Sequence, residues 1–257
     1  MLFEAFTYLT TPCEPQLLSM GYLKELIATE ARYRRCRAAW MPHLDRTKAA
    51  IEDAAHASDG RKKVIVLGAG ILSDIPLQFL AERFETVELV DLCFLRRTRR
   101  ANRHLTNIMW RTADFTGIAE QVAKGAAPKP PFPLQVDLTD PDLVISANVL
   151  SQLPLVPLDF LRRNNPAVDE ASLEQLGANI VRHHLAHLQT SPGVICLITE
   201  VERIFHDGDQ KTATEDPLFG VVPKIEGEEW FWDLAPLGEI RDDFVIRNRV
   251  QGGQMSR

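Results

Sequence analysis

Blocks of hydrophobic residues alternate with amphipathic segments along the chain. Short apolar runs, several rich in β-branched residues, indicate buried strands at 64–67, 87–90, 107–111, 142–148 and 193–200. Between them, apolar residues recur at helical spacing, as at 172–189, and a basic helix is predicted between Asp91 and about Leu105. Strands that alternate with helices predict an α/β fold with a doubly wound, mostly parallel sheet.

The C-terminal part of the chain has a different pattern. Two apolar segments, 229–234 and 244–250, are separated by Pro236 and Gly238 and predict an antiparallel hairpin. Before it, the segment 206–220 is long and polar, so we expect a loop at the ligand-binding end of the sheet, suited to act as a lid.

The N-terminal part is helical in pattern. From Pro15 to Ala57 apolar residues follow helical spacing, which predicts two or three helices joined near Met41 and Pro42. A polar, glycine-containing linker follows at 56–60. We therefore divide the chain into an N-terminal helical extension, residues 1–59, and a main domain, residues 60–257.

A glycine turn and an acidic residue follow the first two predicted strands. Gly68, Ala69 and Gly70 come directly after the first strand, where small residues let the backbone turn and approach a ligand. Asp91 ends the second strand about twenty residues later, where a carboxylate can accept hydrogen bonds from both hydroxyls of a ribose. This arrangement predicts a site for a nucleoside.

Two further motifs extend the pattern, namely Asp114-Phe115 after the third strand and the segment 145–154, Ile-Ser-Ala-Asn-Val-Leu-Ser-Gln-Leu-Pro, after the fourth. With these motifs the chain resembles the class I S-adenosylmethionine-dependent methyltransferases. The resemblance covers about 62–250. It implies a Rossmann-like, seven-stranded sheet with an antiparallel C-terminal hairpin, and S-adenosylmethionine as the cofactor.

The resemblance also implies roles for individual residues. The backbone of Gly68, Ala69 and Gly70 would lie under the methionine part of the cofactor, and Asp91, with Leu92 beside it, would bind the ribose. Asp114 would contact the adenine amino group, and Phe115 would pack beside the ring. Asn148 would line the junction between cofactor and acceptor, and Asp74 would anchor the methionine ammonium.

The chain departs from the family pattern, and some residues have a second interpretation. Leu72 occupies the place of the third glycine, and Val66 stands where an acidic residue is common. Asp114 could instead cap a helix over 115–122, and Asn148 could simply close a turn.

Candidate acceptor-binding residues come from three segments. Arg37, Trp40 and His43 lie on the N-terminal extension, which would fold over the mouth of the cofactor site. Gln152 follows the fourth strand, and His206 lies in the expected lid, where it could act as a general base. No catalytic residue is identified, because a sulfonium methyl group is already activated and needs mainly alignment with its acceptor. The acceptor is a small molecule or a protein side chain.

Two other functions remain open. Gly68, Gly70 and Asp91 would serve an NAD-dependent oxidoreductase equally well. A non-catalytic, cofactor-binding regulator is the third alternative. The strand order separates the first two, because a reversed last strand between the fifth strand and its neighbour favours methyl transfer.

Composition narrows the class of protein further. The formal net charge of −6 over 257 residues argues against general nucleic-acid binding. Four scattered cysteines form no zinc or disulfide pattern and fit a reducing cytoplasm. His183, His184 and His187 have no carboxylate at ligand spacing, so we predict no metal. No apolar run is long enough to cross a membrane, so we expect a soluble cytoplasmic protein; the sequence does not indicate its oligomeric state.

Overall fold

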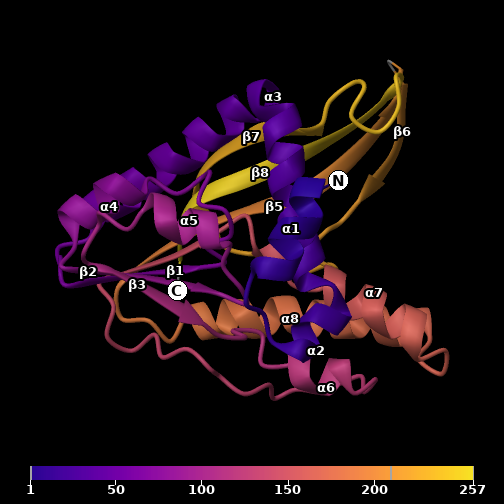
Figure 1. Cartoon of the computed structure of the whole chain (residues 1–257), viewed down its shortest axis with the longest axis horizontal. Helices are drawn as coiled ribbons and strands as arrows, with labels where there is room; N and C mark the ends of the chain where they lie inside the picture. The colour runs from indigo at the N-terminus through magenta and orange to yellow at the C-terminus, as the bar shows by residue number, and fades with distance from the viewer. Residues whose placement is uncertain (1, 209, 257) are drawn as a thin grey trace.

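A single mixed sheet organises the chain in the computed structural model, which describes residues 2–208 and 210–256 (Figure 1). Its strand order is β3-β2-β1-β4-β5-β8-β7, with β6 paired to β5. The strands are β1 Lys63–Leu67, β2 Thr86–Asp91, β3 Ile108–Thr112, β4 Leu143–Ala147, β5 Val194–Asp207, β6 Gln210–Glu215, β7 Ile225–Ala235 and β8 Phe244–Met255.

Strand direction confirms the predicted fold class. Strands β1 to β5 pair in parallel with one another, whereas β8 runs antiparallel to both β5 and β7. The reversed strand β8 therefore lies between β5 and β7, as expected for the Rossmann-like fold with an antiparallel C-terminal hairpin. This is also the order that separates the methyltransferase interpretation from the oxidoreductase one.

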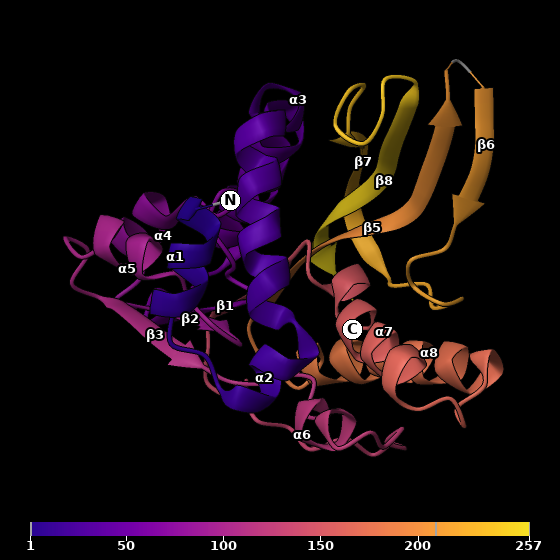
Figure 2. The same ribbon diagram turned by 45° about the vertical axis from the view of Figure 1, so that its right-hand side comes forward.

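Two features of the β5–β6 region correct the prediction. The sheet has eight strands rather than seven, and the expected lid at 206–220 is partly a hairpin. Strand β5 continues to Asp207 and pairs there with both β6 and β8, so the β5–β6 hairpin extends, beside β7 and β8, beyond strands β1 to β4 (Figure 2). All six residues of β6 are exposed. The strand therefore has no apolar alternation by which the sequence could reveal it.

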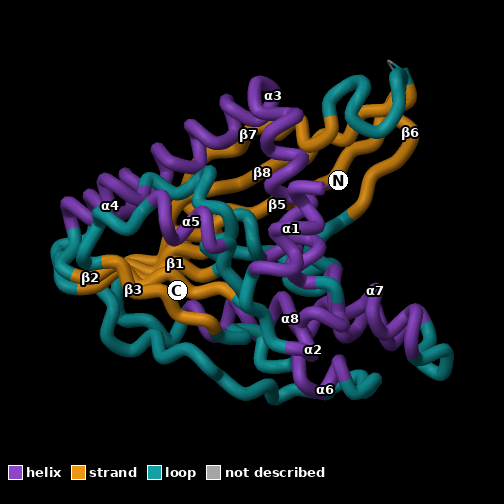
Figure 3. Tube along the Cα trace, viewed as in Figure 1, coloured by secondary structure: helices purple, strands orange, loops and turns teal. Residues whose placement is uncertain are grey.

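Helices cover both faces of the sheet (Figure 3). They are α1 Leu2–Thr10, α2 Pro15–Met20, α3 Tyr22–Ala57, α4 Leu77–Arg83, α5 Arg96–Ala101, α6 Ala119–Ala123, the 3₁₀ turn η1 Leu150–Gln152, α7 Leu155–Asn164 and α8 Glu170–Leu188. Alternate residues of β1 enter different cores: Val64 and Val66 pack with α3 and α4, whereas Ile65 and Leu67 pack with α6, α7 and α8. Both faces of β1 are thus buried, which explains its apolar sequence from Val64 to Leu67, whereas the edge strand β3 is only partly buried.

Helix α3 corrects the expected break near Pro42. It is one helix of 36 residues, and Pro42 lies inside it. A proline there removes a backbone hydrogen bond and strains the preceding turn. Pro42 is exposed, however, while Trp40, His43 and Leu44 are buried against the sheet. Tertiary packing on both sides of Pro42 therefore keeps the helix continuous. The division at residue 59 stays a prediction.

Candidate cofactor and acceptor site

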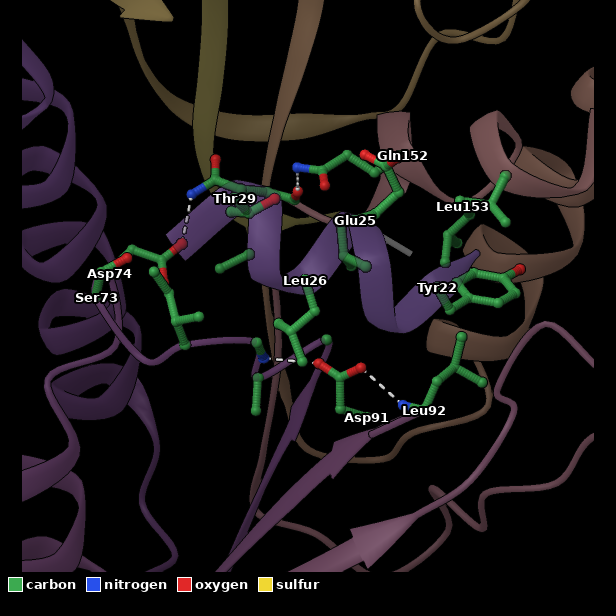
Figure 4. A pocket seen from close by; sticks show the side chains of 18 of the residues that line it. Tyr22, Glu25, Leu26, Thr29, Ser73, Asp74, Asp91, Leu92, Gln152 and Leu153 are labelled. Atoms are coloured by element: carbon green, nitrogen blue, oxygen red, sulfur yellow. Dashed lines mark hydrogen bonds between the residues drawn. The ribbon is translucent and has the colours of Figure 1, made fainter. Parts of the chain in front are cut away.

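The three central strands β2, β1 and β4 end at one pocket. Asp91 ends β2, Gly68 follows β1 and Asn148 follows β4, so the turns and side chains at these positions meet at the carboxyl edge of the sheet. The N-terminal half of α3 covers this edge (Figure 4). The pocket has an empty volume of about 1120 Å³, which includes space open to solvent. Open α/β sheets bind their ligands at this kind of position.

The first position of the glycine turn has no room for a side chain. Gly68 has φ +73°, and a Cβ there would lie 2.6 Å from Val149 Cγ2. Gly70, at φ +52°, also has a left-handed backbone. The turn is closed by Leu72, which adopts φ +63° and donates its N–H to the carbonyl of Ala69 at 3.0 Å. Leu72 thus takes a backbone conformation that usually favours glycine, at the place of the missing third glycine.

Asp91 is fixed by the glycine turn and by its own strand end. One carboxylate oxygen accepts a hydrogen bond of 2.6 Å from Gly70 N, and the other accepts one of 2.7 Å from Leu92 N. Each oxygen can accept a further bond, which leaves capacity for two ribose hydroxyls. Burial raises the pKa of Asp91 to about 6. In Figure 4 its carboxylate lies between Leu92 and Leu26 of α3.

Asp114 lines the same pocket and also organises the backbone after β3. Its carboxylate accepts hydrogen bonds from the backbone N–H groups of Thr116, at 2.9 Å, and Ala119, at 2.8 Å. The second of these bonds reaches the first residue of α6, but that helix spans Ala119–Ala123 and has Ile118 at its N-cap, so Asp114 is not the N-cap of a helix over 115–122. Phe115 is buried and contributes to the lining. Contact of these two residues with an adenine ring stays a prediction.

Asn148 connects β4 with Asp74 in the wall of the pocket. Its Nδ2 donates to Asp74 Oδ2 at 2.8 Å, while Gln152 Nε2 donates to the Asn148 carbonyl at 2.6 Å. Asn148 has φ +56°, which is a strained conformation of the kind found at functional sites. Burial raises the pKa of Asp74, and the hydrogen bond from Asn148 opposes that rise.

The aromatic end of the pocket lies where α3 meets β7. Trp40 and His43 of α3 and Trp232 of β7 all contribute to its lining. Trp40 Nε1 donates to the carbonyl of Leu234 at 3.0 Å, and Trp230 Nε1 donates to His43 Nδ1 at 3.0 Å. Burial lowers the pKa of His43 to about 3, so its imidazole is neutral at pH 7.

Two predicted acceptor residues do not reach this pocket. Arg37 is exposed on α3, one residue beyond the buried face formed by Cys36 and Trp40. His206 lies on the extension of β5, opposite Lys211 of β6 and Val245 of β8. The lid that was expected to carry His206 to the site is a hairpin that extends away from it. We therefore exclude both residues from the site.

Sequence reasoning missed part of the lining. The first two turns of α3 lie over the part of the pocket that contains Asp91 and Asp114, called the cofactor end below. Their lining residues are Tyr22, Glu25, Leu26 and Thr29. Their spacing is that of an ordinary amphipathic helix, so the sequence carries no signal that separates them from core or surface residues. Trp232 lies in the apolar segment 229–234 that predicts a hairpin strand, but the sequence does not indicate the surface against which this side chain packs.

The histidines of α8 have structural contacts. His184 Nε2 lies 2.8 Å from Ser146 Oγ, and His187 Nε2 lies 2.7 Å from the carbonyl of Val136. Burial lowers the pKa values of both groups. In the part of the chain that the structure describes, no group of three or more His, Cys, Asp or Glu residues is arranged to hold a metal ion.

Comparisons with known proteins return methyltransferase structures at low similarity. The N1-methyltransferase of 1,6-didemethyltoxoflavin from Burkholderia thailandensis is 12% identical, with 96% of this chain and 92% of that chain covered and a TM-score of 0.41. The N-methyltransferase NodS from Bradyrhizobium japonicum is 12% identical, with coverages of 83% and 87% and a TM-score of 0.37. Both were solved with S-adenosylhomocysteine. No protein-family model and no curated protein sequence matches the chain.

Proposed function

We propose that this chain transfers a methyl group from S-adenosylmethionine to a small molecule or a protein side chain. The main supporting observation is Asp91, held by Gly70 at the end of β2, in a sheet whose reversed strand β8 lies between β5 and β7. The carboxylate and the glycine turn suit a nucleoside that carries an amino-acid group. The strand order favours methyl transfer over hydride transfer.

The residues present fit S-adenosylmethionine. The turn at Gly68 provides a close backbone approach that a Cβ would prevent. Four carboxylates line the pocket, and no lysine or arginine is among the described lining residues; the acidic members are Glu25, Asp74, Asp91 and Asp114. This negative lining complements a sulfonium and an ammonium group.

Each part of the cofactor then has its residues. The turn of Gly68, Ala69 and Gly70 holds the methionine part, and Asp74 holds its ammonium. Asp91 and Leu92 hold the ribose. Asp114 and Phe115 hold the adenine, and Asn148 lines the junction with the acceptor.

The chemistry requires little from the protein beyond placement. When bound, the cofactor supplies a methyl group whose bond to sulfur breaks with its electron pair left on sulfur, while a lone pair of the acceptor forms the new bond. An acceptor that reacts through N–H or O–H also releases a proton, which passes to solvent. Helix α3, which covers the pocket, excludes water and positions the acceptor relative to Asn148.

Ligand-dependent unfolding tests this proposal directly. S-adenosylmethionine and S-adenosylhomocysteine at a hundred times their Kd should each stabilise the protein by about 2.7 kcal/mol. NAD at the same concentration serves as the control. Stabilisation by NAD alone would support the oxidoreductase, and no stabilisation by any of the three ligands would support the non-catalytic alternative.

The cellular setting is a separate proposal. The four cysteines are widely spaced in the sequence without a zinc or disulfide pattern, and Cys36, Cys93 and Cys196 are buried. This supports a reducing, cytoplasmic location, and the net charge of −6 supports an acceptor other than bulk nucleic acid. Within the described residues, no helix combines the length and apolar character needed to cross a membrane. Fractionation of the native host would check the location.

A further inference from the structure

Three residues of the pocket lining, two at its aromatic end and one after β4, carry buried polar atoms without a hydrogen-bond partner. These atoms are His43 Nε2, Trp232 Nε1 and Asn148 Oδ1, and all three residues belong to the pocket lining. The residues are only 1%, 6% and 7% exposed, respectively. A buried polar atom without a partner is unfavourable, so such atoms in a pocket wall point to a ligand that pairs with them.

The hydrogen-bond network determines which of these atoms are donors. Trp230 Nε1 can only donate, and it donates to His43 Nδ1, so Nδ1 carries no proton. The imidazole is neutral, and its single proton therefore lies on Nε2. Trp232 Nε1 is also a donor. Asn148 Nδ2 donates to Asp74, which leaves Asn148 Oδ1 as an acceptor. The set therefore offers two donors and one acceptor.

His43 and Trp232 form an aromatic cluster with Trp40 in the pocket wall. The rings of His43 and Trp232 are stacked, with centroids 4.2 Å apart and planes 7° from parallel. Trp40 meets Trp232 edge-on, at 5.0 Å and 81°. Aromatic walls of this kind favour a flat ring over a flexible chain.

Charge restricts the ligand further. The described lining contains the four carboxylates named above and no lysine or arginine. His43 is neutral, so it cannot compensate a negative ligand. A carboxylate or phosphate in this pocket would lose its hydration without gaining a cationic partner.

We propose that the α3–β7 end of the pocket, formed by Trp40, His43, Trp232 and Asn148, is the acceptor subsite and takes a neutral, flat aromatic or heteroaromatic molecule. The molecule carries a carbonyl or ring nitrogen that accepts from the two N–H donors, and an N–H or O–H that donates to Asn148 Oδ1. This assignment rests on the proposed function for its description as an acceptor site. The other lining residue with a buried unpartnered atom, Tyr22, lies near Asp114 at the cofactor end and is outside the subsite.

Three small probes of similar size test the subsite. Benzamide has a flat ring, a carbonyl and an N–H group; benzoate adds a negative charge; cyclohexanecarboxamide keeps the amide but loses the flat ring. Their Kd values are measured by NMR titration at pH 7.5, with the free protein and with S-adenosylhomocysteine. We expect benzamide to bind at least tenfold more tightly than benzoate and at least threefold more tightly than cyclohexanecarboxamide.

A pair of variants locates the binding. Trp232→Phe removes one unpartnered donor and keeps the ring, so benzamide should bind about threefold to tenfold more weakly while the Kd of S-adenosylhomocysteine changes less than twofold. Trp110→Phe, on β3 and outside the pocket lining, is the matched control and should change neither value.

The outcomes separate this inference from the proposed function. Equal binding of benzamide and benzoate, or no effect of Trp232→Phe on benzamide, overturns the subsite even if S-adenosylhomocysteine binds. Failure of S-adenosylhomocysteine to bind overturns the methyltransferase proposal. The benzamide selectivity of the free protein still supports or overturns the subsite in that case.

Discussion

The carboxylate of Asp91 accepts a hydrogen bond of 2.6 Å from the backbone N–H of Gly70, which joins the end of β2 to the turn that follows β1. The acid that would bind a ribose and the turn that would hold the methionine part are therefore one structural unit. A change at either position acts on both.

Replacing Asp91 by alanine should remove nucleoside binding. Two charge-assisted hydrogen bonds to ribose hydroxyls are lost, so we expect S-adenosylhomocysteine to bind about 100-fold more weakly, measured by calorimetry. Asp242→Asn, at an exposed position between β7 and β8, is the control and should bind as the wild type does. A fully folded Asp91→Ala protein with unchanged affinity would remove the ribose role.

The affinity for S-adenosylhomocysteine should depend on pH through Asp91. Burial raises the pKa of Asp91 from 3.8 to about 6, and the ionised form is the one that accepts two hydroxyl donors. Below pH 6 the affinity should fall by about tenfold per pH unit. Calorimetry between pH 5 and 7.5 would show this slope, and a flat profile would contradict it.

The raised pKa of Asp91 also makes the stability of the protein depend on pH, but in the opposite direction to the ligand affinity. A raised pKa in the folded state means that protonated Asp91 contributes stability, which is full below pH 4 and is lost as the pH rises through about 6. Asp91→Asn cannot titrate at this position. The difference in unfolding free energy, wild type minus variant, should therefore decrease between pH 4 and 6 in urea titrations, whereas a difference that increases with pH would contradict the shift.

The two glycines of the turn should differ in their tolerance of alanine. Gly68→Ala combines a left-handed backbone with a Cβ placed 2.6 Å from Val149 Cγ2, and should lower the free energy of unfolding by about 2–4 kcal/mol. Gly70→Ala has only the backbone cost of about 1–2 kcal/mol, since the nearest atom is 3.8 Å away. Adding Val149→Ala should recover little of the Gly68 loss, because the Cβ of Val149, which alanine keeps, would lie 2.7 Å from the added Cβ. Equal losses in urea unfolding would disagree with this geometry.

The hydrogen bond between Trp230 and His43 should contribute to the docking of α3 on β7. Trp230→Phe leaves His43 Nδ1 without a donor, and His43→Phe leaves Trp230 Nε1 without an acceptor. Each single variant should lose about 1–3 kcal/mol, and the double variant should lose less than the sum of the two. Strict additivity in a double-mutant cycle would show that the two groups do not interact.

Pro42 should be a position where substitution stabilises the protein. Alanine restores the N–H that a helix interior uses and removes the clash with the preceding turn, at an exposed site. The greater freedom of the unfolded chain offsets part of this gain. We expect Pro42→Ala to raise the free energy of unfolding by about 1–2 kcal/mol, and a destabilised variant would show that the proline is accommodated in α3 without strain.

Much of the central sheet could be predicted because its strands are buried on both faces. The runs that became β1, β2 and β4 are mostly apolar, with Glu88 and Ser146 as buried polar exceptions, and this pattern is visible in the sequence. The same strands place Gly68, Asp91 and Asn148 at their carboxyl ends. Parallel strand direction then brings these residues to one edge without any further information.

Residues were misassigned where neighbours in space, rather than neighbours in sequence, decide the structure. Strand β6 forms because the exposed edge of the extended β5 supplies backbone partners, and α3 continues through Pro42 because its buried face is packed on the sheet. His206 was placed at the site on the expectation of a lid, and pairing of β5 with β8 and β6 moves it away.

The sequence by itself determined the order of strands and helices, the glycine turn and the acid after β2, because burial on both faces and left-handed backbone positions restrict which residues can occur there. Only the tertiary structure decided what closes the pocket. Trp232 reaches His43 through the packing of β7 against α3, and contacts between segments nearly two hundred residues apart leave no periodic signal in either one.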